Sequence, residues 1–195
     1  MKNFKLILLG AILCFNFSTL FSQTESKSLI KPFGIGLHIE QFKINDILDL
    51  QNTPANKIVL SISPSKSFRL EPELGLRFAK SQANSASASS VSLGLGAFGM
   101  FQRNKLNIYA GVRIEYATMK STSTYSTAKT LSNRIMAGPA LGAEYYLGEN
   151  FTFGGEVGLR YASSTTTVDP KPTGYTDTKS SYFTTDTGLF VRFYF

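Results

Sequence analysis

Apolar and polar residues alternate with a period of two along most of the chain. In the clearest run, from Phe151 to Ala162, the odd positions are mostly apolar and the even positions are polar, charged or small. The same alternation recurs from Leu106 to Ala117 and from Phe68 to Phe78. Successive side chains of a β-strand point to opposite faces, so a period of two indicates strands. The pattern predicts eight of them, near 33–42, 57–64, 68–79, 91–101, 106–117, 134–147, 151–162 and 181–195.

These runs have the length of strands that cross a bilayer, which takes about 9–11 tilted residues. After the first 22 residues, the sequence has no run of roughly 18 apolar residues that could form a transmembrane helix. Any spanning must therefore be done by strands. These strands must form a closed barrel, because lipid offers no hydrogen-bond partners to the backbone groups of an open sheet edge. The predicted fold is all-β, a closed antiparallel eight-stranded transmembrane up-and-down barrel.

Alternation alone does not decide which face points outward, because a soluble lipocalin-like barrel has the same period with its apolar side chains inside. Three features favour an outward apolar face. A narrow lumen has room for small residues, and the polar face carries Gly34, Gly36, Gly75, Gly94, Gly96, Gly111, Gly138, Gly142, Gly154, Gly158 and Gly188. Membrane interfaces favour aromatic residues, and the apolar rows end in Phe33, Phe68, Phe101, Tyr145, Phe151 and Phe195 on one side and Phe78, Tyr116, Tyr161 and Phe183 on the other.

The charges on the polar face are a third feature. They are glutamate and arginine with hardly any lysine, and arginine suits enclosed, bidentate pairing with carboxylates. We expect them to form a lumenal charge network of Glu40, Arg69, Glu71, Glu73, Arg77, Arg113, Glu115, Glu144, Glu156, Arg160 and Arg192. The structural interpretation is a salt-bridge network that fills the interior. The alternative is a gated path, in which the network rearranges to pass ions.

The connections between the predicted strands alternate in length. Short turns are expected at 64–67, 102–105 and 148–150, and long loops at 41–56, 80–90, 118–133 and 163–180. In outer-membrane barrels the short turns face the periplasm and the long loops face outward. The long segments carry Lys43, Lys80, Lys120, Lys129, Lys171 and Lys179. These lysines are either solvated or contact lipopolysaccharide phosphates or an acidic surface ligand.

The first 22 residues have the layout of a secretory signal peptide. A basic start at Lys2 and Lys5 precedes an apolar stretch from Leu6 to Phe17, and small or polar residues follow up to Ser22. We expect cleavage near Ser22, leaving one barrel domain over 23–195. Because Cys14 would leave with the signal, we expect no disulfide and no thiol chemistry in the exported protein. Removal of Lys2 and Lys5 would also lower the formal charge of +7.

The strand from Thr187 to Phe195 alternates up to a C-terminal phenylalanine. With these features the chain resembles the OmpA/OmpX-type eight-stranded outer-membrane β-barrels over essentially all of 23–195. The resemblance implies an outer-membrane location, contact with outer-membrane lipids and lipopolysaccharide, and a monomer that binds no nucleic acid. It also implies recognition by periplasmic chaperones and the barrel-assembly machinery through a terminal signal, here Gly188, Val191, Phe193 and Phe195. In the frame that ends on Phe195 the family usually has glycine at position 190, where this chain has Phe190.

Candidate catalytic and metal-binding residues are few. His38 lies beside Glu40, and with Ser61, Ser63 or Ser92 it could act as a general base in acyl transfer on lipid A, as in some eight-stranded barrels. No histidine–serine pair in the sequence matches those enzymes, so a packed histidine is favoured. A single histidine and the absence of a calcium-loop motif predict neither a metal nor a cofactor.

The pattern therefore predicts a non-enzymatic role in surface structure, envelope integrity or recognition through the extracellular loops. Two alternatives stay open. One is a porin-like small or gated pore for ions and small solutes, and the other is a lipid A-modifying enzyme.

Overall fold

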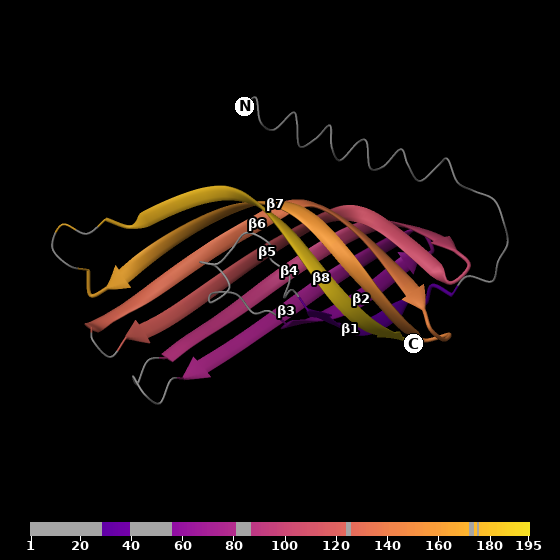
Figure 1. The fold of residues 1–195 in the computed structure, drawn as a ribbon, viewed down its shortest axis with the longest axis horizontal. Helices are drawn as coiled ribbons and strands as arrows, with labels where there is room; N and C mark the ends of the chain where they lie inside the picture. The colour runs from indigo at the N-terminus through magenta and orange to yellow at the C-terminus, as the bar shows by residue number, and fades with distance from the viewer. Residues whose placement is uncertain (1–28, 40–55, 81–86, 124–125, 172–173, 175) are drawn as a thin grey trace, which may run out of the picture.

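The computed structural model describes residues 29–39, 56–80, 87–123, 126–171, 174 and 176–195. All eight predicted strands are present. Seven begin within four residues of the predicted start, and the sixth begins eight residues earlier. Their bounds are β1 Phe33–Ile39, β2 Asn56–Ser65, β3 Phe68–Lys80, β4 Ser87–Arg103, β5 Leu106–Ser123, β6 Ser126–Tyr146, β7 Phe151–Asp169 and β8 Thr178–Tyr194 (Figure 1).

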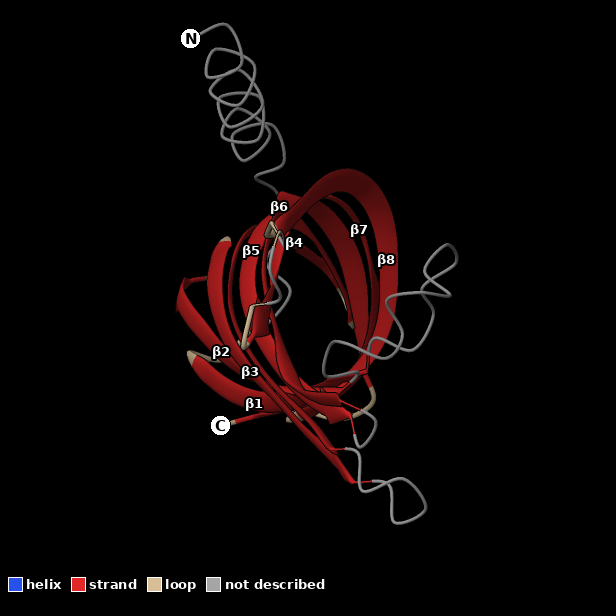
Figure 2. Ribbon diagram, turned by 90° about the vertical axis from the view of Figure 1, so that its left-hand side faces the viewer, coloured by secondary structure: helices blue, strands red, loops and turns tan. Residues whose placement is uncertain are grey.

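The strands form a closed antiparallel barrel in sequence order, as predicted. Each strand pairs with the next along the chain, and β1 pairs with β8 from Gly34↔Tyr194 to Ile39↔Leu189. Figure 2 shows the resulting ring of strands. Closure leaves no free edge along the paired length, and this is the condition for placing a sheet in lipid. No helix in the described part of the chain is long and apolar enough to cross a membrane.

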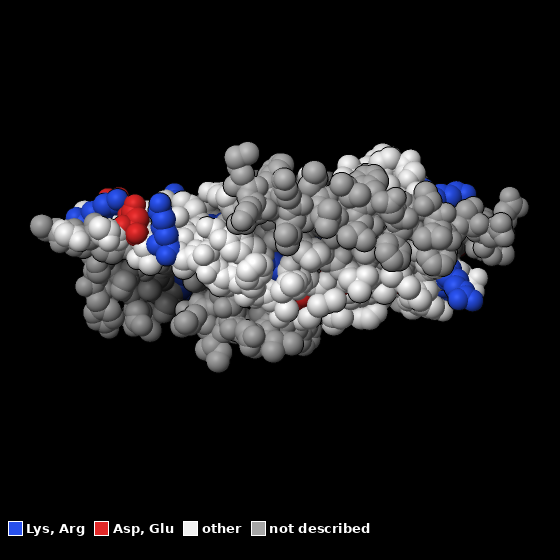
Figure 3. All heavy atoms as spheres, turned by 90° about the horizontal axis from the view of Figure 1, so that it is seen from above, with Lys and Arg blue, Asp and Glu red and all other residues white. Residues whose placement is uncertain are grey.

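The apolar face points outward, which confirms the membrane-type orientation and excludes the lipocalin-like arrangement. Val112 and Leu141 are exposed by 53% and 52%, whereas Arg69 and Arg113 are 1% exposed. Most of the charged residues visible in Figure 3 lie near the two ends of the molecule. An apolar band between charged ends fits a bilayer and its two interfaces.

The two ends of the barrel differ. The short-turn end holds the connections after β2, β4 and β6, together with Phe195. In the turn between β4 and β5, Asn104 adopts a positive φ of 55°, a conformation that asparagine tolerates better than most residues. The long-loop end holds the other four connections.

The long loops expected at 118–133 and 163–180 were predicted wrongly for most of their length. β5, β6 and β7 run on to Ser123, from Ser126 and to Asp169, and β6 is 21 residues long against 7 for β1. Figure 1 shows β4 to β8 extending past β1 and β2 at the long-loop end. These extensions consist largely of serine and threonine, and they continue the hydrogen-bonded ladder outside the apolar band, where both faces can be polar. Tyr116, Tyr161 and Phe183 are the outward aromatic residues nearest the long-loop end on β5, β7 and β8. We call the parts of β4 to β8 that lie on the long-loop side of these residues the raised wall.

Candidate functional site

The lumen holds a balanced set of buried charges contributed by β2, β3 and β5 to β8. Among the described residues, the buried cations are Lys57, Arg69, Arg113, Arg134, Arg160 and Arg192, and the buried anions are Glu71, Glu73, Glu115, Glu144, Glu156 and Asp186. All occupy inward positions of the alternation. Burying a charge without a partner is costly, so equal numbers of the two signs are what a closed lumen requires.

Arg113 on β5 is the centre of this lumenal charge network. Its guanidinium reaches Glu73 at 2.8 Å, Glu71 at 2.9 Å and Glu156 at 2.7 and 2.9 Å. The Tyr109 hydroxyl donates to the same Glu156 carboxylate at 3.0 Å. These contacts join β3, β5 and β7 across the interior through one side chain. The planar fork of arginine suits such multiple charge-assisted hydrogen bonds.

A second cluster lies toward the short-turn end. Arg192 on β8 contacts Glu71 and Glu144, each at 2.8 Å. Arg69 contacts Glu144 at 2.9 Å and donates to the Tyr194 hydroxyl, and Tyr194 in turn donates to Glu144 at 3.0 Å. Glu71 therefore belongs to both clusters, because it accepts from Arg113 and from Arg192.

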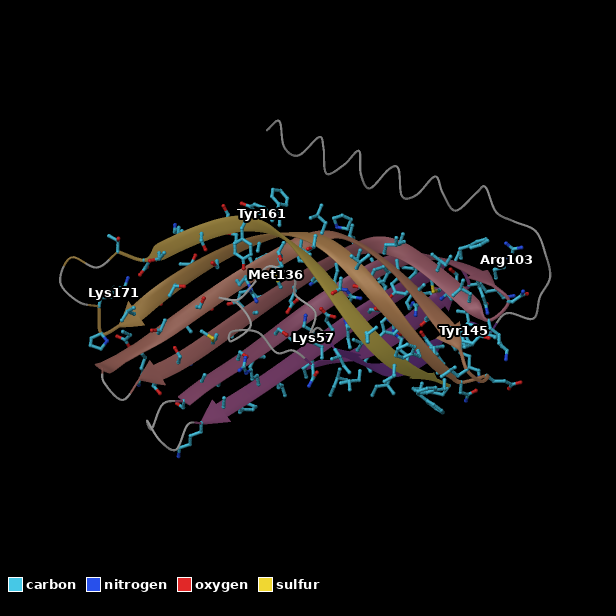
Figure 4. All side chains as sticks on the ribbon, in the orientation of Figure 1. Lys57, Arg103, Met136, Tyr145, Tyr161 and Lys171 are labelled. Carbon is cyan, nitrogen blue, oxygen red and sulfur yellow. The ribbon has the colours of Figure 1, made fainter. Side chains whose placement is uncertain are left out.

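A third cluster lies toward the long-loop end. Lys57 on β2 donates to Glu115 at 2.6 Å. Arg160 on β7 contacts the same carboxylate at 3.1 Å and also pairs with Asp186 on β8. Figure 4 labels Lys57 at the end of β2, close to the middle of the barrel's length. The three clusters together cross-link strands on opposite sides of the ring.

The half of the lumen toward the short-turn end also holds an apolar cluster, which we call the apolar floor. This floor consists of Phe98, Met100, Tyr109, Ala140 and Phe190, against which Ile30 packs from the segment before β1. Arginines cover the same rings, with the Arg192 guanidinium 3.7 Å from the centre of Phe190 and that of Arg69 4.8 Å from the centre of Tyr109. Such cation–π contacts are strongest where water is excluded. Charge network and apolar floor therefore form one packed unit.

The segment that carries Ile30 is tied to both sides of the barrel mouth. The Leu29 amide donates to the Gln102 side chain on β4 at 3.2 Å. Lys31 Nζ donates to Asn150 Oδ1, in the turn after β6, at 2.7 Å. The Ser63 amide donates to the Pro32 carbonyl at 2.7 Å. These bonds hold the segment that carries Ile30 at the short-turn end of the barrel, where Ile30 packs against the apolar floor.

Lumenal glycines make room for the large inward side chains of neighbouring strands. Gly154 on β7 lies opposite Phe190 on β8, and a methyl group on Gly154 would overlap the Phe190 ring. Gly34 on β1 stands in the same relation to Tyr194. The glycine-rich polar face and the bulky interior are therefore two sides of one packing arrangement.

Most of the network residues expected from the sequence are brought together, but two are not. Glu40 lies outside the described residues. Arg77 is only half-buried and lies on β3 beyond Glu73, toward the long-loop end. The sequence reasoning missed Lys57, Arg134 and Asp186, which are all buried. Lys57 lies two and four residues before Val59 and Ser61, so its side chain points to the same inward face. This spacing was the signal that could have identified it.

The residues of the expected terminal signal lie on both faces of β8. Val191, Phe193 and Phe195 point outward, with Phe193 48% exposed, whereas Gly188 faces the lumen, where a side chain would meet His38. Phe190, at the position where the barrels that the sequence resembles usually have glycine, is buried in the apolar floor.

Two of the three candidate serines, Ser61 and Ser92, do not pair with His38. His38 packs edge-on against Phe190, with 6.1 Å between ring centres. The Oγ atoms of Ser61 and Ser92 have no hydrogen-bond partner in the described part of the chain, so neither is bonded to His38. No group of three or more His, Cys, Asp or Glu residues able to hold a metal occurs within the described ranges.

Three features identify the architecture: the closed strand order, the outward apolar face and the buried lumenal charges. The chain has the fold of an eight-stranded outer-membrane β-barrel. No protein-family model matches the sequence, and no curated protein sequence matches it.

Solved outer-membrane proteins are similar to this barrel in fold. A major outer membrane protein from Thermus thermophilus is 12% identical, with 84% of this chain and 98% of that chain covered and a TM-score of 0.49. Ail, the attachment invasion locus protein of Yersinia pestis, is 10% identical, with 83% and 95% covered and a TM-score of 0.45. Neisserial surface protein A is 14% identical, with 84% and 95% covered and a TM-score of 0.45.

Proposed function

We propose that the chain resides in the outer membrane as a sealed barrel that conducts no solutes. In this proposal it acts at the long-loop end, in surface recognition or in envelope integrity, and it is not an enzyme. The observation that carries the proposal is the filling of the lumen by the buried lumenal charge network and the apolar floor.

Sealing follows from how the interior is filled. An eight-stranded barrel is just wide enough for its own side chains, and here four arginines and three tyrosines are among the largest fully buried residues. Arg113 alone connects carboxylates on β3 and β7. An ion passing through would have to break these paired charges and displace Ile30 from the floor. The porin-like alternative needs this rearrangement, and the sealed barrel does not.

The raised wall supports a role at the surface. It presents a paired, polar sheet beyond the apolar band, where β7 and β8 stay in register up to Thr166↔Thr178. A rigid sheet loses less conformational entropy on binding than a free loop, which favours recognition. Exposed lysines lie along this end at Lys80, Lys120, Lys129, Lys171 and Lys179, and Lys43 lies outside the described residues.

These lysines suit the phosphates of lipopolysaccharide, which we include in the proposal as a partner. Lys171 is partly balanced by Asp177 at 2.9 Å. The outward row of Val191, Phe193 and Phe195 supports a second proposed contact, with the barrel-assembly machinery and its chaperones during insertion. Both contacts are transient or peripheral and leave the barrel a monomer.

Conductance of the purified protein in planar bilayers tests the proposal. We expect little steady conductance, because the filled lumen offers no continuous water path. Stable large openings in most recordings would contradict the sealed barrel and favour the pore. Fractionation with the outer membrane, and a mobility shift on heating in SDS, test the location and the folded barrel independently.

Catalysis is tested separately by comparing lipid A from cells with and without the protein. We expect identical acyl-chain composition, since His38 packs on Phe190 and pairs with neither Ser61 nor Ser92. A change in lipid A acylation that depends on His38 would contradict the non-enzymatic role.

A further inference from the structure

An apolar hollow lies on the outer surface where the barrel closes. It spans β1, β8 and β7 and has a volume of about 230 Å³. Outward side chains of Ile35, Leu37, Phe151, Val191 and Phe193 line it. Ile35 and Phe151 both lie opposite Phe193 in the strand register, and Leu37 lies opposite Val191. The smaller Val191 therefore forms the bottom between larger neighbours, and we call this hollow the seam groove.

A cation, Lys31, is bonded to the turn that leads into the seam groove. Lys31 Nζ donates to Asn150 Oδ1 at 2.7 Å, and Asn150 immediately precedes the lining residue Phe151. The Asn150 carbonyl also accepts from the Tyr194 amide at 2.7 Å, which fixes this turn against β8. An ammonium group has three donors, so the bond to Asn150 leaves Lys31 able to bind an anion as well.

The rest of this end is basic too. Among the described residues, the short-turn end carries the cations Lys31, Lys66, Arg103 and Lys105 against two carboxylates, those of Glu149 and of the terminal residue Phe195. Figure 4 labels Arg103 at this end, far from Lys171. The turns that hold Lys66 and Arg103 are neighbours, because the Met100 amide donates to the Ser67 carbonyl at 2.8 Å. We call these four cations the basic rim.

We propose that the seam groove and Lys31 form a binding site for an anionic phospholipid of the periplasmic leaflet. One acyl chain lies in the seam groove over Val191, and the phosphate is held by Lys31, with the basic rim adding attraction. The seam groove lies on the membrane-facing surface and the cation lies at its short-turn end. This arrangement matches a lipid, whose acyl chains lie in the membrane and whose phosphate lies at the interface. Lipopolysaccharide is excluded as the occupant because it occupies the other leaflet, at the long-loop end.

This inference rests on the proposed insertion in the outer membrane. The chain refolded in nonionic detergent is first checked for its mobility shift on heating. It is then titrated with phosphatidylglycerol or with phosphatidylcholine of the same acyl chains, and bound lipids are counted by native mass spectrometry. We expect one phosphatidylglycerol to be retained in preference to phosphatidylcholine.

Two matched pairs of variants separate the parts of the site. Lys31→Gln should weaken phosphatidylglycerol binding about fivefold, the contribution of one basic residue at an anionic surface, while Lys171→Gln at the other end leaves it unchanged. Val191→Phe fills the seam groove and should weaken binding of both lipids. Val157→Phe, outward on β7 away from the groove, should have no effect.

Equal binding by the Lys31 and Lys171 variants, or by the Val191 and Val157 variants, would overturn the site. A soluble peptidoglycan fragment provides a further arm. Binding of that fragment lost in Lys31→Gln, without a preference for phosphatidylglycerol, would overturn the lipid site in favour of a cell-wall contact. A chain that shows no mobility shift and does not insert contradicts the proposed function, whereas an inserted barrel without lipid preference contradicts this inference alone.

Discussion

Gly142 on β6 lies directly opposite Tyr109 on β5, and a methyl group on Gly142 would overlap the end of the Tyr109 ring. That ring is 1% exposed and belongs to the apolar floor. Its hydroxyl donates to Glu156 at 3.0 Å, so the ring cannot move without disturbing a carboxylate of the lumenal charge network. One glycine thus sets the position of both the floor and the network.

Gly142→Ala should therefore destabilise the barrel by about 1–3 kcal/mol, the usual cost of overpacking a filled interior. Urea unfolding of the protein in lipid vesicles measures this change. Gly99→Ala is the matched control, because a methyl group there would meet its nearest neighbour, the Ala110 carbonyl, at an ordinary 3.8 Å. Equal stability of the two variants would show that the Tyr109 ring relaxes freely.

Arg113→Ala should have a larger effect. It removes the shared partner of Glu71, Glu73 and Glu156, and a buried pair that loses one partner typically costs about 3–5 kcal/mol. Unfolding by urea again provides the measurement. Lys171→Ala breaks the largely exposed pair with Asp177 and should cost less than about 1 kcal/mol.

A double substitution tests whether the cost comes from the unpaired carboxylates. Arg113→Ala combined with Glu156→Gln should recover part of the loss, since one orphaned charge is removed. Strict additivity of the two single effects would argue against direct coupling between Arg113 and Glu156.

The alternation of the sequence was sufficient to predict the strand number, the closed barrel and which face is lined by charge. It could not predict the ion pairs. Arg192 and Glu71 are 121 residues apart and meet across the lumen, and that contact depends on the stagger of all eight strands. Asp186 was not expected in the network, although it faces the lumen and its contact with Arg160 makes it part of the interior.

The strand ends were missed for a different reason. Hydrophobic alternation stops where the apolar band stops, but pairing between strands does not. From Ser163 to Thr167 both faces of β7 are serine or threonine, a composition that looks like a loop when only hydrophobicity is considered. Threonine is β-branched and favours strands. Outside the membrane its hydroxyl group stays in water, so it has no desolvation cost.

The raised wall can be tested by amide hydrogen exchange. Thr165 and Thr166 on β7 are paired with β6 on one side and with β8 on the other, so their amides should exchange much more slowly than that of Gly174, which lies in a turn. If these amides exchanged as fast as that of Gly174, the region would be a loop, as its composition suggested, and the raised wall would be contradicted. NMR of the barrel in micelles resolves the individual amides.

The thickness of the membrane band can be tested with arginine substitutions along the outer face. Val112 is 53% exposed and lies on β5 between Leu106 at the short-turn end and Tyr116, where the raised wall begins. Val112→Arg should destabilise the inserted barrel by about 2–4 kcal/mol, the cost of arginine at the middle of a bilayer. Ser181→Arg is the control, since Ser181 points outward on β8 beyond Phe183, in the raised wall, and should cost about 0–1 kcal/mol. Unfolding in lipid vesicles and in short-chain detergent separates the membrane contribution, because the difference between the two variants should shrink in detergent. Equal costs in lipid would place Val112 outside the apolar core of the bilayer and contradict the position of the band.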